Sequence, residues 1–290
     1  NAASMENSGF EFSATYRNRD HALKYDISAN VSTLKNKVTS LGIGKDSYIA
    51  GAYATYVGQE IGKFYGWVYK GIARTQEDLD NNAVQQGANV GDCLYEDISG
   101  PDGTPDGVID AYDQTVLGSG LPKVNFGLST HLEYKGFDLN ISTYGVLNYH
   151  VSDDIYNSLN SCYGYGNKEV GMLDANRWSE DGSTYLSSVP RTYAANNATL
   201  AWNDLFSSRK IQNAAYWKIA NVELGYNFPD KWFGGYVNGV RLYVSAQNLY
   251  TFTSYHGYNV DYAGGTFTPG YNFCSFPSAR TFMCGLHFTF

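Results

Sequence analysis

Hydrophobic and polar residues alternate one by one in several segments of the chain. The clearest alternation lies at 10–17, 25–32, 124–134, 137–142, 221–228, 240–247 and 281–290. Alternation with this period gives a β-strand one apolar face and one polar face. The segment 56–72 is interrupted by glycines, but its aromatic centre is rich in strand-forming residues. The pattern therefore predicts an all-β, antiparallel fold of at least eight strands.

The connections between these segments differ in length in an ordered way. Read back from the C-terminus, they cover 253–279, 229–239, 148–212, 135–136, 73–123, 39–55 and 19–22. Except for the last turn, long and short connections alternate. A membrane β-barrel has short turns on one rim and long loops on the other, whereas a soluble sandwich has no reason to sort its connections by end. The sorting favours a transmembrane barrel, with a soluble half-buried sheet as the alternative.

The composition narrows the class of protein. The chain has 290 residues, of which 43% are hydrophobic and 16% aromatic, and its net charge is −8. Disordered chains are poor in aromatic residues, so that class is excluded. No apolar run approaches the roughly 18 residues of a membrane-spanning helix, which excludes a helical membrane protein. An acidic chain without a cluster of Lys and Arg also argues against a nucleic-acid partner.

The segment 102–113 reads as a twelve-residue calcium-binding loop. Its oxygen ligands, in order, are Asp102, Thr104, Asp106, the Val108 carbonyl, Asp110 and Asp113. Gly107 stands where such a loop turns sharply. Hard oxygens that converge from a short flexible segment suit a structural Ca²⁺, or Mg²⁺ in its place. A bound ion would brace the loop and perform no chemistry; the alternative is an acidic, solvated surface turn.

The segment 148–212 carries many aromatic residues among Asn, Ser and Asp. They are Tyr149, Tyr156, Tyr163, Tyr165, Trp178, Tyr185, Tyr193 and Trp202. Aromatic faces beside polar neighbours suit sugar rings or peptide backbones. The alternative is that these side chains pack the loop against itself or against a partner, so no individual substrate contact is assigned.

The cysteines lack the CxxC spacing of a zinc or thioredoxin-type site. Strand parity predicts Cys284 on the lipid-facing side, and Cys93, Cys162 and Cys274 in outer loops. A Cys93–Cys162 disulfide and free thiols are both compatible with the sequence. The chain carries no GxSxG, HExxH, P-loop or dinucleotide-binding motif, so no enzyme activity is predicted.

Three stretches near the C-terminus carry a family resemblance. They are 215–229 (AYWKIANVELGYNFP), 240–253 (VRLYVSAQNLYTFT), and 279–282 (ARTF) with 288–290 (FTF). They closely resemble the end of SusC-like (SusC/RagA) TonB-dependent outer-membrane transporters. The resemblance extends upstream through 57–66 (VGQEIGKFYG) and 107–110 (GVID), so it covers nearly the whole chain in family order.

The resemblance implies the C-terminal part of a large, 22-strand-class transmembrane β-barrel with a plugged lumen, in the cell outer membrane. The plug and N-terminal regions of the family are not found in this sequence and are expected elsewhere in the same polypeptide. Segments 73–123 and 148–212 are then long extracellular loops, the first an insertion with the calcium-type loop. The resemblance also implies alternative first metal ligands at Asp97 and Ser99. It implies a barrel-assembly signal at Phe288 and Phe290.

The function implied by the resemblance is TonB-dependent import of a nutrient, an oligosaccharide or a peptide, across the outer membrane. The implied partners are a SusD-like surface lipoprotein, the TonB complex, the remaining barrel and plug segments, and membrane lipid. The competing interpretation is a soluble, calcium-braced, carbohydrate-binding all-β module.

Overall fold

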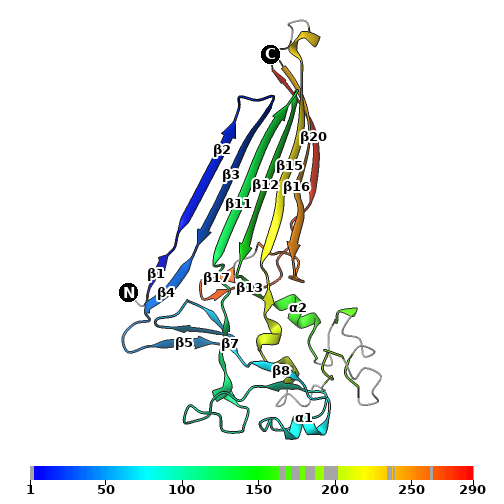
Figure 1. Cartoon of the computed structure of the whole chain (residues 1–290). Coiled ribbons are helices and arrows are strands. Elements are labelled where there is room, and N and C mark those ends of the chain that lie inside the picture. The colour runs from blue at the N-terminus through cyan, green and yellow to red at the C-terminus, as the bar shows by residue number, and fades with distance from the viewer. Residues whose placement is uncertain are drawn as a thin grey trace.

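The computed structural model describes residues 3–162, 167–170, 177–179, 187–192, 202–233, 237, 239–261 and 264–289. Within these residues the largest element is a seven-stranded antiparallel sheet, which we call the wall (Figure 1). In sheet order its strands are β2 (Glu11–Asn18), β3 (Leu23–Thr33), β11 (Val124–Tyr134), β12 (Phe137–Leu147), β15 (Tyr216–Phe228), β16 (Gly239–Thr253) and β20 (Thr281–Thr289). The order of the strands in the sheet is their order in the chain, and β2 and β20 are its two edges. The prediction of an antiparallel all-β fold is confirmed.

Segment 56–72, which the sequence predicts as strand, does not join the wall. Part of it forms β7 (Lys63–Gly66), which belongs to a sheet of order β10-β7-β6-β5, and part forms β8 (Tyr69–Ile72), which pairs with β9. The partners are β5 (Ser47–Ala50), β6 (Tyr53–Tyr56), β9 (Cys93–Tyr95) and β10 (Thr115–Gly118). Gly58 and Gly62 have φ angles of +89° and +61°, a backbone region that glycine enters without a steric penalty. These turns divide a segment whose composition alone suits a strand.

With 56–72 outside the wall, the lengths of the wall's connections alternate without exception. The short connections cover 19–22, 135–136 and 229–238, and the long ones cover 34–123, 148–215 and 254–280. Successive antiparallel strands place successive connections at opposite ends. All the long connections therefore lie at one end of the wall, where they form a layer that we call the loop layer (Figure 1).

The remaining elements are short. The strands are β1 (Ser4–Ser8) paired with β4 (Lys35–Ser40), β13 (His150–Asp153) between β14 (Gln212–Asn213) and β19 (Tyr271–Asn272), and β17 (Gly264–Gly265) paired with β18 (Thr268–Pro269). The helices are α1 (Gln76–Asp80), α2 (Asp154–Leu159) and the 3-10 turns η1 (Ala111–Asp113), η5 (Trp202–Asp204), η6 (Ser208–Lys210) and η7 (Asp230–Trp232). Among the described residues, no helix has the length and apolar character needed to cross a membrane.

The wall has one apolar face that is open to its surroundings. The strand registers align one transverse row of partners on this face: Tyr25, Leu132, Leu139, Leu224, Val244 and Cys284. Leu224 is 44% exposed and Val244 is 50% exposed, and Phe12 and Phe282 on the same face are exposed further. A contiguous apolar surface of this extent suits lipid and not water. The register also confirms that Cys284 lies on the lipid-facing side.

A bulge keeps this face continuous along β15. Before the bulge the outward residues have odd numbers, Trp217 and Ile219, and after it they have even numbers, from Val222 onward. The register pairs Thr143 with Ile219 and Ser142 with Asn221, which leaves the residue between them without a partner. A bulge inserts one such residue and reverses the alternation of the strand. The outward residues of β15 therefore stay on one face of the wall, although their numbers change from odd to even.

Aromatic side chains cluster at both ends of the apolar face. At the loop-layer end, the rings of Trp217 and Phe252 stack at 5.1 Å. At the short-turn end, Phe228 packs against Tyr226 at 5.0 Å and Trp232 at 5.8 Å. The path from Trp217 to Phe228 is about 36 Å at roughly 3.3 Å per residue, or about 26 Å along the barrel axis at a tilt of about 45°. This spacing matches the apolar band between the two aromatic girdles of outer-membrane barrels.

The opposite face of the wall is polar, and its charged groups pair with one another. Asp138 is 6% exposed and accepts hydrogen bonds from Arg241 Nε and Asn227 Nδ2, both at 2.9 Å. Arg241 also pairs with Glu223 at 2.7 Å. A second charged group on the adjoining strands consists of Arg19, Lys24, Asp26, His131 and Glu133. A polar inner face of this kind is typical of a barrel lumen.

The two faces predict opposite responses to a new charge. Val222→Arg places a cation on the apolar face midway between the aromatic girdles, and we expect a loss of about 2–4 kcal/mol in folding free energy. Asn221→Arg, on the polar face of the same strand, should have little effect. The measurement is denaturant-dependent folding of the full-length protein into lipid bilayers. Equal losses for the two variants would contradict the assignment of the faces.

Candidate functional site in the loop layer

The loop layer is built around two buried apolar clusters. One consists of Val146, Tyr149, Val151, Ala214, Tyr216, Tyr255 and Val260. The other consists of Cys93, Tyr95 and Ile109, with Trp67, Tyr69, Ala83, Trp202 and Leu205 packed against it. Each cluster draws residues from two of the long connections. The connections therefore pack as a folded layer with its own cores.

A buried carboxylate joins the second and third long connections. Asp153 is 3% exposed, and it accepts hydrogen bonds from the Tyr255 hydroxyl, from Asn272 Nδ2 at 2.9 Å and from the Tyr156 amide at 2.8 Å. Burial raises the pKa of the Tyr255 hydroxyl, which therefore remains a donor. The backbone follows the same junction, since the Ser152 amide donates to the Gly270 carbonyl at 2.9 Å.

The predicted metal loop is closed by hydrogen bonds between carboxylates and backbone amides. Asp113 is fully buried, and its oxygens accept from the amides of Ile98 at 2.8 Å, Ser99 at 3.2 Å and Asp110 at 2.8 Å. Asp97 Oδ2 accepts from the Gly107 amide at 2.7 Å. The two ends of segment 97–113 are thus tied to each other.

The two alternatives for the first metal ligand have different surroundings. Asp102 is exposed and accepts only from its own turn, from the amide and hydroxyl of Thr104, which hold the pKa of its carboxyl below the usual value. Asp97 Oδ1, by contrast, is buried and has no hydrogen-bond partner in the described part of the chain. An unpaired buried carboxylate oxygen is unfavourable unless a cation or water meets it. Asp97 thus has a buried carboxylate oxygen open to a cation or water, whereas the Asp102 carboxylate is exposed.

The other predicted ligands lie on the same segment. Asp106 Oδ1 accepts from the Val108 amide at 3.0 Å, and Asp110 Oδ1 accepts from the Tyr112 amide at 2.7 Å. Val108 forms a parallel bridge with Val84. Across the residues described, no group of three Asp, Glu, His or Cys side chains converges as a metal site would require. A cation at this loop would therefore rely on carbonyl oxygens or water as well as carboxylates.

Most of the described aromatic side chains of 148–212 are buried or packed against other rings. Tyr149 is 3% exposed and Trp178 is 8% exposed, while Trp202 packs on Tyr95 with ring centroids 6.1 Å apart. Tyr156 stacks on His256 at 5.7 Å. The packing alternative therefore describes Tyr149, Trp178 and Trp202, whereas Tyr156 also lines a cavity. Tyr163, Tyr165, Tyr185 and Tyr193 lie outside the described residues, as does Phe290.

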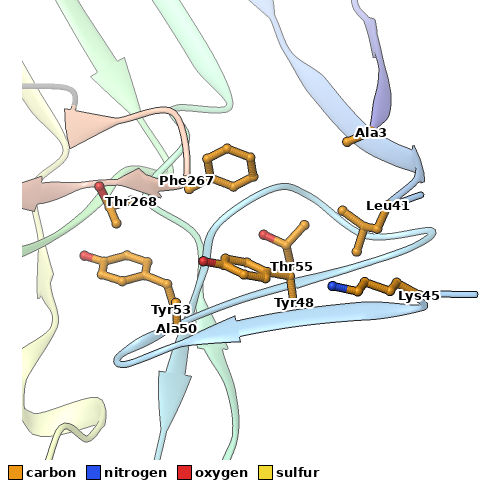
Figure 2. Close-up of a pocket in the computed structure, with 9 residues that line it drawn as sticks. All are labelled: Ala3, Leu41, Lys45, Tyr48, Ala50, Tyr53, Thr55, Phe267 and Thr268. Carbon is orange, nitrogen blue, oxygen red and sulfur yellow. The ribbon is translucent and has the colours of Figure 1, made fainter. Parts of the chain in front are cut away.

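An apolar pocket of about 410 Å³ lies where the first and third long connections meet (Figure 2). Its lining residues are Ala3, Leu41, Lys45, Tyr48, Ala50, Tyr53, Thr55, Phe267 and Thr268. Figure 2 shows the rings of Tyr53, Tyr48 and Phe267 at one end and Leu41 with Ala3 at the other. The Tyr53 hydroxyl is buried and has no hydrogen-bond partner among the residues described. The pocket thus combines flat aromatic walls with one unpaired polar group.

Comparison with known proteins places the whole chain among bacterial receptors. TonB-dependent receptor P3 of Formosa agariphila is 30% identical over 309 residues, which covers 100% of this chain and 29% of the receptor. TonB-dependent receptor SusC of Bacteroides thetaiotaomicron is 25% identical over 310 residues, covering 100% of this chain and 27% of SusC. Over its whole length, the chain is similar to a part of SusC-like TonB-dependent receptors. It spans about three-tenths of the length of these curated relatives.

Solved structures show the same fold. The structure of the RagAB peptide transporter matches 100% of this chain and 29% of its own, with a TM-score of 0.79 and 21% identity. The RagAB peptide importer in its closed-closed state matches with a TM-score of 0.77. No protein-family model matches the chain. The wall is therefore part of an outer-membrane β-barrel, as the alternation and the sorted connections predict.

Exposed aromatic residues of this SusC-like segment lie in a connection that no sequence pattern singles out. Tyr258 is 61% exposed, Phe273 is 60% exposed and Phe276 is 88% exposed, all within 254–280. Their only signal was aromatic residues outside any period-two segment. Phe288 pairs with Val240 on the apolar face of the wall and is 49% exposed.

The cysteines carry free thiols. Cys93 and Cys162 are fully buried in the loop layer, and burial raises their pKa to about 12 and about 11. Both side chains are therefore neutral at pH 7. The structure corresponds to the free-thiol alternative and not to a Cys93–Cys162 disulfide.

Removal of the Tyr53 hydroxyl and removal of the Thr55 hydroxyl should have different effects on local stability. Tyr53→Phe should leave local stability unchanged or raise it by up to about 1 kcal/mol, because the lost hydroxyl has no partner. Thr55→Val should cost about 1–3 kcal/mol, because the Thr55 hydroxyl accepts from the buried Gly62 amide at 2.9 Å. Amide hydrogen exchange across 53–66 in the full-length receptor measures both. A loss for Tyr53→Phe as large as that for Thr55→Val would show that the Tyr53 hydroxyl is bonded.

Proposed function

We propose that this chain supplies part of the barrel wall and the outer vestibule of a TonB-dependent importer, which carries an oligosaccharide or a peptide across the outer membrane. The observation that carries the proposal is the wall, with a lipid-type apolar face, a polar inner face and all its long connections at one end. The similarity to TonB-dependent receptors and to the RagAB peptide transporter supports it. A soluble carbohydrate-binding module would leave the apolar face of the wall in water.

In this proposal the loop layer faces the outside of the cell, so that segments 73–123 and 148–212 are extracellular. A SusD-like surface lipoprotein covers the layer and delivers the nutrient to it. The TonB complex acts through a part of the receptor outside this chain, and further barrel strands pair with the edges β2 and β20. Phe288 and Phe290 act in barrel assembly as the terminal aromatic signal.

Uptake separates an importer from a surface receptor that only binds. In a strain without the full-length receptor, we expect uptake of one class of labelled oligosaccharide or peptide to fall to background. A strain without TonB should show the same loss, and the restored receptor gene should reverse the first. The lipoprotein partner should copurify with the receptor in detergent. Unchanged uptake of all tested nutrients in the receptor deletion would contradict import.

We also propose that segment 97–113 binds a structural Ca²⁺, or Mg²⁺. The unpaired Asp97 Oδ1 supports this, as does the position of Asp106, whose carboxylate lies against the backbone at Gly100. Carboxylate and carbonyl oxygens are the ligands that Ca²⁺ prefers. The ion would brace the loop and take no part in chemistry.

Calorimetric titration of the metal-free full-length receptor with CaCl₂ or MgCl₂ tests this site. We expect binding that Asp97→Asn or Asp106→Asn weakens at least tenfold, about 1.4 kcal/mol. Asp102→Asn should have a smaller effect on binding if Asp97, and not Asp102, is the first metal ligand. Asp20→Asn, in an exposed short turn of the wall, is the control for lost charge. Absence of binding heat with both ions, and no change on Asp106→Asn, would contradict a metal site.

A further inference from the structure

A second cavity, of about 300 Å³, lies within the loop layer where the first two long connections meet. Its lining residues include Tyr69 of β8, Tyr156 and Asn157 of α2, Asn160, and Arg209 with Lys210 of η6. Figure 1 places β8 and α2 in the loop layer, away from the short-turn end of the wall. We call this cavity the Arg209 pocket.

The partly buried guanidinium of Arg209 has no hydrogen-bond or ion-pair partner among the residues that the structure describes. The groups that interact most strongly with it electrostatically are Cys93, Cys162, Tyr69 and Tyr95. Burial holds the pKa of the Cys93 and Cys162 thiols at about 12 and about 11 and raises the pKa of both tyrosines. All four are neutral at pH 7, so none compensates the positive charge.

The carboxylates of the region are engaged elsewhere. Asp204 lies 3.8 Å from Lys210 Nζ and accepts from the Ser161 hydroxyl at 2.7 Å and the Cys162 amide at 3.2 Å. Glu169 is exposed and accepts from Asn160 Nδ2 at 2.8 Å. Lys210 therefore has a counterion, whereas no described carboxylate pairs with Arg209.

An arginine removed from bulk water without a counterion is unfavourable, because the lost hydration is not replaced. In ordered proteins such groups are paired or bind a ligand. The guanidinium presents a planar fork of donors that matches a carboxylate in two parallel hydrogen bonds. Tyr69 and Tyr156 add hydroxyl donors and flat apolar surface to the same pocket. The cavity is large enough for a small group that carries one carboxylate.

We propose that the Arg209 pocket is a substrate subsite that binds a carboxylate group through the Arg209 guanidinium. This inference rests on the proposed import function and narrows its substrate to a nutrient that carries an acidic group. The carboxylate comes either from an acidic sugar unit or from a peptide, through an acidic side chain or the C-terminus. The same arginine serves in both cases.

Binding of small carboxylate probes to the purified full-length receptor tests the subsite. The probes are D-glucuronate and N-acetyl-L-glutamate, with D-glucose and N-acetyl-L-glutamine as their neutral counterparts, titrated by calorimetry at low salt. We expect at least one carboxylate probe to bind at least tenfold more tightly than its neutral counterpart. Tighter binding of glucuronate identifies a sugar source, and tighter binding of N-acetylglutamate identifies a peptide source.

Variants separate Arg209 from the general charge of the loop layer. Arg209→Gln should reduce the affinity for the carboxylate probe at least tenfold. The affinity of Arg209→Lys for the probe should lie between those of the parent and of Arg209→Gln. Lysine keeps the positive charge but cannot form the two parallel hydrogen bonds. Lys37→Gln, on the exposed strand β4, removes one positive charge elsewhere and should leave binding unchanged. If Arg209→Gln fails to fold, as judged by its electrophoretic shift on heating, Arg209→Lys alone must still weaken binding.

The subsite is overturned if the carboxylate probes bind no more tightly than their neutral counterparts, or if folded Arg209 variants bind them as the parent does. These results leave the import proposal untouched, because uptake in the deletion strain measures it separately. Conversely, Arg209-dependent binding by a receptor whose deletion leaves uptake unchanged would refute import and retain the binding site.

Discussion

Each wall strand must offer apolar side chains to lipid and polar side chains to the lumen while its backbone groups pair with neighbouring strands, and the rest of the structure depends on this constraint. Hydrocarbon contains no water to satisfy an unpaired amide or carbonyl, so the strands stay in continuous register. Register in turn fixes the face of every side chain. The transverse row that ends at Cys284 and the ion pairs around Asp138 are two results of the same rule. Connections lie outside the hydrocarbon, and they are free to become long and to fold.

The loop layer is stabilised by a different chemistry. Buried carboxylates serve as its joints: Asp153 ties two connections together, Asp113 closes the metal-type loop, and Asp92 accepts two hydrogen bonds from Arg191 and one from Asn203. In each case amides or a cation satisfy the buried charge, as folded proteins require. Arg209 departs from this rule, since no carboxylate among the described residues pairs with it. Its positive charge is therefore open to a group from outside the layer.

The sequence alone predicts the wall well, because a two-residue period and the faces of strands are local properties. It fails at 56–72, where composition suits a strand but the left-handed glycines Gly58 and Gly62 turn the chain, and φ angles are not readable from residue type. The loop layer is less predictable for the same reason. The motif at 102–113 is local, yet the unpaired oxygen belongs to Asp97, and only tertiary packing shows it. Arg209 carries no sequence signal at all, because a missing counterion is a property of what surrounds a residue.

The bulge in β15 has a consequence for how this wall tolerates change. Lys218 is 3% exposed and pairs with Asp261 inside the loop layer. Its number has the same parity as Val222 and Leu224, so in an unbroken strand its ammonium group would project toward lipid while Trp217 turned inward. The one extra residue at Ala220 exchanges the two. Loss of a single residue between Lys218 and Val222 would therefore move a charge across the wall, whereas loss of two would leave both side chains on their present faces. In β15, the side chains that face the membrane depend on whether an odd or an even number of residues is lost, more than on the length of the strand.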